Sequence, residues 1–144
     1  MTFHNINYTT IKEKNLQISL YLLSAVTSGI GFTTQMLVSG FWSTAFSQDV
    51  FYFSANVAFY FLSLGVGSMV SERVRVVKIK TLFFLAILLS FWAGGAISVL
   101  RFAIAHWGGT IPMVFIPILT VSIAGIFSGM VIPMTIRVQA DGIR

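Results

Sequence analysis

Long, mostly apolar segments alternate with short polar ones along the whole chain. Four apolar segments cover residues 16–39, 50–71, 81–105 and 111–136, and each is more than twenty residues long. At about 1.5 Å per residue, a helix of that length crosses the roughly 30 Å hydrocarbon core of a bilayer. The segments lack the period-two alternation of barrel strands. We therefore predict an all-α integral membrane protein, a bundle of four transmembrane helices.

The polar segments between these runs predict the ends and connections of the helices. Residues 1–15 form a polar lead, residues 40–49 a first loop, residues 72–80 a basic loop and residues 137–144 a short polar tail. The first loop contains Trp42, which we expect at the membrane surface because tryptophan is enriched among the lipid headgroups.

The amino-acid composition agrees with the pattern of apolar segments and narrows the class of protein. Of the 144 residues, 56% are hydrophobic and only 9% are charged, and the mean hydropathy is +0.89, which excludes an ordinary soluble domain. There is no cysteine, so disulfides, thiolate metal sites and redox pairs are excluded.

The basic residues predict the orientation of the helices. On the predicted topology one side of the membrane carries only Arg101, and the other carries Lys12, Lys14, Arg73, Arg75, Lys78, Lys80, Arg137 and Arg144. Because cytoplasmic loops are rich in lysine and arginine, we expect both termini in the cytoplasm, and we expect a multi-pass protein of the bacterial inner (cytoplasmic) membrane.

The net charge of +5 arises from cations that flank apolar spans. Anionic lipid headgroups are therefore the expected partner, and nucleic acid is not. The cytoplasmic contacts with lipid or with a partner are assigned to Arg73, Arg75, Lys78 and Lys80.

Reactive side chains are few and lie near the predicted membrane boundaries. The carboxylates are Glu13, Asp49, Glu72 and Asp141. A proton-coupled small multidrug transporter normally needs a carboxylate inside the membrane, so this class is not favoured. His4 and His106 fall on opposite sides of the predicted membrane and cannot share a haem or a metal. We expect a protein that is not an enzyme, with no catalytic residue, no metal and no cofactor.

Two amide side chains lie within the predicted spans. In an antiparallel hairpin of the first two helices, Gln35 and Asn56 have similar depths and can hydrogen-bond each other. Such bonds contribute to helix packing in membranes. A packing role is favoured over contact with a substrate, and both interpretations stay open at this point.

Small residues at a spacing of four predict close helix packing. The fourth span contains Gly125 and Gly129 as a GxxxG motif, and the second has Ser63 and Gly67 at the same spacing. Such pairs let two helix backbones approach closely, either inside the bundle or against a partner protein. The candidate packing or partner-interface residues are Gly29, Ser63, Gly65, Gly67, Ser68, Gly125 and Gly129.

These motifs also resemble those of a known family. Ser28-Gly29 followed by Gln35, LSLGVGS over residues 62–68 followed by Arg73, and Gly125, Gly129 and Pro133 near the end of the fourth span form the matching pattern. The pattern resembles the membrane module that precedes the catalytic domain in membrane-bound spermidine synthase-like proteins, which are polyamine aminopropyltransferases. The family's catalytic domain has no counterpart in this sequence, so no catalytic residue is carried over.

The basic loop also resembles the loop between the second and third helices of major facilitator transporters.

We predict a non-catalytic accessory or scaffold subunit that packs against a larger membrane complex, with other membrane subunits or further copies of itself as partners. The alternatives are a half-transporter for a small organic cation such as a polyamine, or the membrane anchor of a separate aminopropyltransferase chain.

Overall fold

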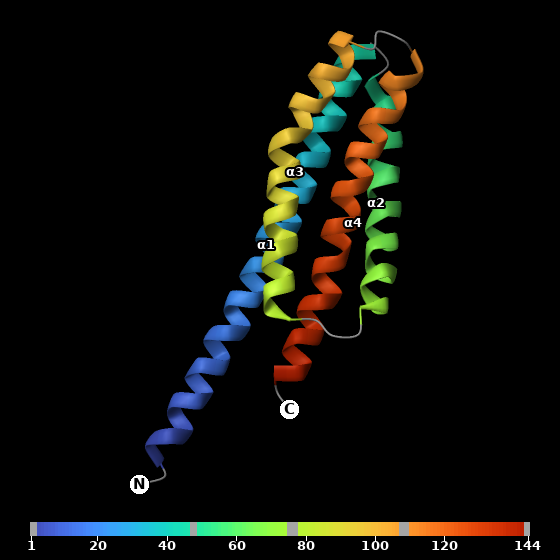
Figure 1. The fold of residues 1–144 in the computed structure, drawn as a ribbon. Helices are drawn as coiled ribbons and strands as arrows, with labels where there is room; N and C mark the ends of the chain where they lie inside the picture. The colour runs from blue at the N-terminus through green and yellow to red at the C-terminus, as the bar shows by residue number, and fades with distance from the viewer. Residues whose placement is uncertain (1–2, 47–48, 75–77, 107–109, 143–144) are drawn as a thin grey trace.

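The chain forms four long helices joined by short connections. The computed structural model describes residues 3–46, 49–74, 78–106 and 110–142. The helices are α1 (Phe3–Phe46), α2 (Asp49–Arg73), α3 (Ile79–His106) and α4 (Thr110–Gly142), shown in Figure 1. Each contains a stretch long and apolar enough to cross a membrane. The prediction of an all-α, multi-pass membrane protein is thereby confirmed.

Successive helices run in opposite directions. The first residues of α1 and α3 and the last residues of α2 and α4 therefore lie at one end of the bundle (Figure 1). The opposite ends of the four helices lie together at the other end. We call these the terminal end and the far end; which of them faces the cytoplasm stays a prediction.

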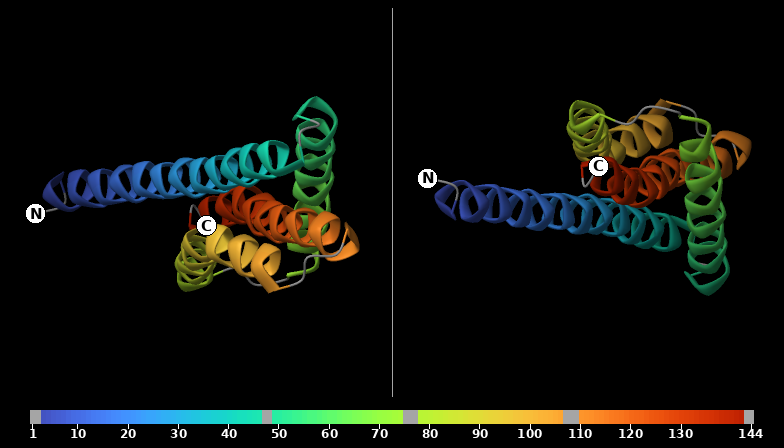
Figure 2. Two further views of the ribbon diagram at one scale, coloured as in Figure 1. Left: turned by 90° about the horizontal axis from the view of Figure 1, so that it is seen from above. Right: turned by 90° about the horizontal axis from the view of Figure 1, so that it is seen from below.

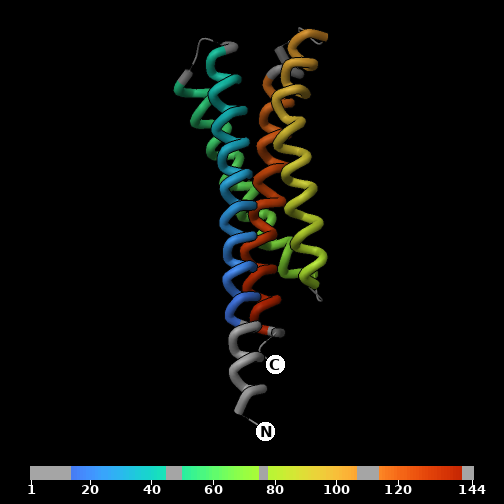
Figure 3. The backbone as a smooth tube through the Cα atoms, turned by 90° about the vertical axis from the view of Figure 1, so that its left-hand side faces the viewer, coloured from blue at the N-terminus to red at the C-terminus, as the bar shows by residue number. Residues whose placement is uncertain are grey.

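Helix α4 lies at the centre of the bundle with α1 beside it. Both contact each of the other helices, whereas α2 and α3 do not contact each other within the described residues although they are consecutive. The two end-on views in Figure 2 place α2 and α3 on different sides of α4. In Figure 3, α2 crosses α4 at an angle instead of running alongside it. The interior is therefore arranged around α4.

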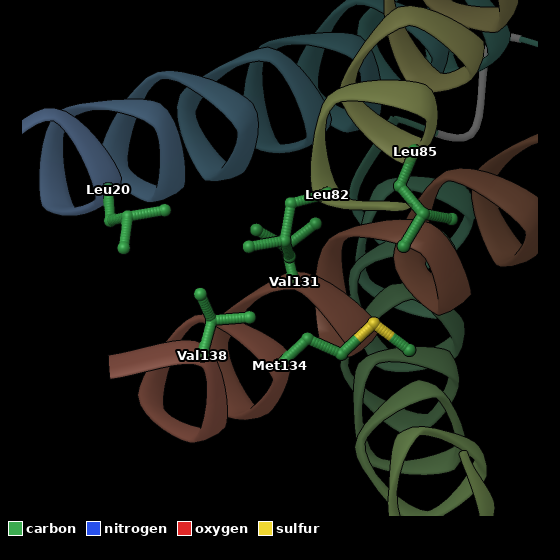
Figure 4. Close-up of a cluster of buried hydrophobic side chains, with 6 residues drawn as sticks. All are labelled: Leu20, Leu82, Leu85, Val131, Met134 and Val138. Carbon is green, nitrogen blue, oxygen red and sulfur yellow. The ribbon is translucent and has the colours of Figure 1, made fainter. Parts of the chain in front are cut away.

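Two apolar clusters fill the interior, one towards each end. Figure 4 shows the cluster at the terminal end, which joins α1, α3 and α4 and consists of Leu20, Leu82, Leu85, Val131, Met134 and Val138. The second cluster takes residues from all four helices and consists of Val38, Tyr60, Ala96, Leu100 and Val121. Helix α3 is held to α4 by a further contact, in which the Trp92 indole Nε1 donates a hydrogen bond to the Thr120 carbonyl at 3.1 Å.

The helices extend beyond several predicted boundaries. α2 and α3 begin and end within two residues of the prediction, but α1 starts at Phe3 and α4 continues to Gly142. Residues 3–15 are thus helical and continuous with the first span, and most of the predicted tail is helix. Hydropathy marks where the chain leaves the hydrocarbon, whereas a helix ends only where its backbone hydrogen bonds end.

The prediction for Trp42 and the first loop was wrong. α1 continues to Phe46, so residues 40–46 are helical. Trp42 is only 2% exposed, and its ring lies 5.0 Å from the ring of Tyr52, centroid to centroid, on α2. The tryptophan is therefore a packing residue that joins α1 to α2, and not a surface anchor among headgroups.

Candidate functional site

The closest helix contact is the crossing of α2 and α4, and it is built from the two small-residue motifs. Ser63 and Gly67 of α2 face Gly125 and Gly129 of α4. A Cβ atom added at Gly125 would lie 2.8 Å from both the Ser63 Cβ and the Tyr60 carbonyl oxygen. The two backbones are thus in direct contact, which only residues without a side chain permit.

The backbone contact recurs at two more points of the crossing. A Cβ atom at Gly67 would collide with the carbonyl oxygen of Ile126, and a Cβ atom at Gly129 would collide with that of Leu64. Both obstacles are backbone atoms, which cannot rotate aside as a side chain can. Any larger residue at either position must therefore push the helices apart. The GxxxG motif of α4 is therefore used inside the bundle, where α2 covers it.

Helix α1 joins the crossing at Gly31, which was not among the predicted packing residues. A Cβ atom at Gly31 would collide with the Ser128 Oγ and would lie 3.0 Å from the Tyr60 Oη. Tyr60 and Ser128 are both buried, so two hydroxyl groups from α2 and α4 converge on this glycine. The available signal in the sequence was the spacing of four residues between Gly31 and Gln35.

The two predicted amides are both almost completely buried. Asn56 is 0% exposed and Gln35 is 1% exposed. Asn56 lies four residues before Tyr60, and Gln35 lies four residues after Gly31, so both continue the helix faces that meet at the crossing. A candidate site thus runs along the crossing and consists of Gly31, Gln35, Asn56, Tyr60, Ser63, Gly67, Gly125, Ser128 and Gly129.

The hydrogen bonds of the amides differ from the expectation. The Gln35 Nε2 donates to the Ser39 Oγ at 3.2 Å, within the same helix, and not to Asn56. Neither side-chain polar atom of Asn56, nor the Oε1 of Gln35, has a hydrogen-bond partner among the described residues. Leaving an amide unpaired away from water costs several kcal/mol, on the order of 2–7. The two side chains therefore have unused hydrogen-bonding capacity inside the membrane span.

The hydroxyl groups of the four buried threonines bond to carbonyls of their own helices. The Oγ1 atoms of Thr27 and Thr34 donate to carbonyls four residues earlier, at 2.6 and 2.7 Å. Thr120 and Thr135 do the same in α4. Such bonds are common for threonine in membrane helices, and they pair these four hydroxyl groups without the help of another helix.

The remaining predicted packing residues lie elsewhere. Gly29 and Gly65 are exposed, and no atom lies within 4 Å of a Cβ atom placed at either one. Ser68 is half-buried, and its carbonyl accepts a hydrogen bond from the Ser71 Oγ at 2.6 Å. The crossing thus uses Gly67 but not Gly65, because residues two positions apart lie on different faces of a helix.

Of the predicted cytoplasmic cations, Arg73, Lys78 and Lys80 are exposed at the terminal end. Arg75 lies outside the described residues. One cation of the predicted tail has an unexpected role, because the Nη1 of Arg137 donates to the carbonyls of Ser71 and Val74 at 2.8 and 3.2 Å. A guanidinium from α4 thereby caps the carboxyl end of α2, where unpaired carbonyls and the helix dipole favour a positive charge.

The chain was compared with models of protein families, with curated proteins and with solved structures, and none of them matches. The resemblance to the spermidine synthase-like membrane module therefore rests on its sequence motifs alone and stays a hypothesis.

Proposed function

We propose that this chain is an integral membrane accessory or scaffold subunit whose outer helix surfaces receive the helices of a larger complex. The proposal is carried by the outer face of α3. A groove of about 110 Å³ opens there on the surface of the bundle, and it is lined by Phe91, Trp92, Gly95, Ala96 and Val99.

The shape and chemistry of this groove suit a side chain from a neighbouring helix. No atom lies within 4 Å of a Cβ atom placed at Gly94 or Gly95, so a helix backbone can approach closely. A water molecule occupies about 30 Å³, so the groove has room for several heavy atoms. Small residues flanked by large apolar ones are typical of the surfaces at which membrane helices associate.

Filling the groove tests this proposal. We expect Gly95→Trp to release the partner during purification in mild detergent while leaving thermal unfolding unchanged, because open space surrounds this glycine. Ile87→Trp is the matched control, since Ile87 is an exposed residue of α3 that does not line the groove. Mass spectrometry of the native particle identifies the partner. A monodisperse native particle that contains this chain alone would contradict the proposal.

The half-transporter alternative is favoured by one observation, the unused hydrogen-bonding capacity of Asn56 and Gln35 within the span. It predicts uptake of a labelled polyamine by liposomes that contain the purified chain, and loss of that uptake in Asn56→Leu. The accessory proposal predicts no uptake in either case.

The anchor alternative is a special case of the accessory role, in which the partner is an aminopropyltransferase. It is distinguished by the identity of the chain that copurifies. An aminopropyltransferase among the copurified chains would support the anchor, and its absence from an intact complex would remove it.

A further inference from the structure

An open groove of about 570 Å³ lies on α2 at the terminal end of the bundle. It is lined by Val66, Met69, Val70, Glu72 and Arg73. The three apolar residues come first along the helix and are all exposed, and the two charged residues follow at its last turn. The groove thus passes from an apolar wall to a charged mouth.

The position of the groove matches one phospholipid molecule. From Val66 to Arg73 the helix rises about 10 Å, from inside the hydrocarbon towards its boundary. Helix α3 does not contact α2 in the described part of the chain, so it does not cover this face. An acyl chain can therefore lie along the apolar wall, with its headgroup at the charged mouth.

The charges at the mouth select the headgroup. Glu72 and Arg73 have opposite charges and are adjacent in sequence, and adjacent residues on a helix do not face each other. Both side chains are exposed and line the same groove. They therefore offer a separate acceptor and a separate donor to a ligand that carries both signs of charge.

A neighbouring arginine makes the mouth compatible with a phosphate. The carboxyl end of a helix repels anions through its unpaired carbonyls. Here the Arg137 guanidinium binds the Ser71 and Val74 carbonyls and supplies a compensating positive charge. The Arg73 side chain can then donate to phosphate oxygens beside this capped helix end.

We propose that this groove binds a phospholipid with a primary-amine headgroup, namely phosphatidylethanolamine. Its phosphate accepts hydrogen bonds from Arg73, and its ammonium group donates to the Glu72 carboxylate. This inference concerns a lipid ligand and does not depend on the accessory role. It also differs from a general attraction of anionic lipids to the basic loop, which requires no carboxylate.

Native mass spectrometry tests the proposal on the full chain from liposomes that contain equal amounts of phosphatidylethanolamine, phosphatidylglycerol and phosphatidylcholine. We expect roughly tenfold more retained phosphatidylethanolamine than phosphatidylcholine, because the quaternary amine of the latter cannot donate a hydrogen bond. Equal retention of these two lipids, or a preference for phosphatidylglycerol, would overturn the assignment.

Variants separate the groove from the rest of the basic surface. We expect Glu72→Gln to abolish the preference for the amine headgroup and Arg73→Gln to reduce the retention of all three lipids. Val66→Trp, which fills the apolar wall, should remove the bound lipid without changing thermal unfolding. Lys80→Gln is the control, because Lys80 is an exposed cation that does not line the groove. If Lys80→Gln lowered retention as much as Arg73→Gln, or Val66→Trp left retention unchanged, the groove would not be the site.

Discussion

Adding one methyl group at Gly67, by the substitution Gly67→Ala, tests the crossing of α2 and α4. The new Cβ atom would collide with the Ile126 carbonyl oxygen and lie 2.9 Å from the Ile126 carbonyl carbon. Since these are backbone atoms, the two helices must separate along the whole contact. Overpacking of this kind typically costs about 1–3 kcal/mol.

The same substitution at Gly65 provides a matched control two residues away. No atom lies within 4 Å of the Cβ position at Gly65, and the change from glycine to alanine has the same intrinsic effect on the helix at both sites. The difference between the two variants therefore isolates the interhelical contact. We expect Gly67→Ala to be less stable than Gly65→Ala by about 1–3 kcal/mol, roughly 5- to 150-fold in the folding equilibrium.

The measurement is unfolding of the purified protein by dodecyl sulfate in mixed micelles, followed by tryptophan fluorescence. Trp42 is buried at the joint of α1 and α2 and should report the loss of packing. Equal unfolding midpoints for the two alanine variants would refute the backbone contact, because the contact is the property in which the two positions differ.

Three further predictions concern other contacts. Arg137→Gln should lower the free energy of unfolding by about 1.5–3 kcal/mol, since a charged donor to the Ser71 carbonyl is lost. Arg101→Gln is the control, because Arg101 is exposed, and it should change the free energy of unfolding by less than about 0.5 kcal/mol. Trp92→Phe should cost about 1 kcal/mol through loss of the 3.1 Å bond to α4, and an unchanged midpoint would show that this bond does not stabilise the fold. Asn56→Leu should leave stability equal or higher, because it removes a buried amide without a partner in the described chain; a large loss of stability would mean that the amide is hydrogen-bonded.

The sequence was sufficient to predict the four helices because each apolar run is long enough to cross a bilayer, and only a helix satisfies its backbone there. It was insufficient for the helix ends. Trp42 and Arg137 lie in segments polar enough to suggest loops, yet both residues belong to helices and form contacts between helices. The polarity of a segment indicates whether it lies inside the hydrocarbon. It does not indicate where the backbone hydrogen bonds of the helix end.

The sequence was also insufficient to predict which face of each helix packs inside the bundle. In a soluble protein the polar face shows which side is outside, but here Gly65 and Gly67 both stand among apolar residues, and only one of them meets α4. The Ser63 to Gly67 and Gly125 to Gly129 spacings marked the surfaces that cross. Gly31 was not selected, because its role depends on Tyr60 and Ser128, which approach it from two other helices.

The crossing also has a consequence for how the protein is made. Ser71 and Arg137 are separated by 66 positions in the chain, so during synthesis the whole of α3 enters the membrane before α4 can reach α2. Until then the face of α2 that carries Ser63 and Gly67 lacks its contact with the α4 backbone. Assembly of the crossing is therefore completed only when the last helix of the chain has been inserted.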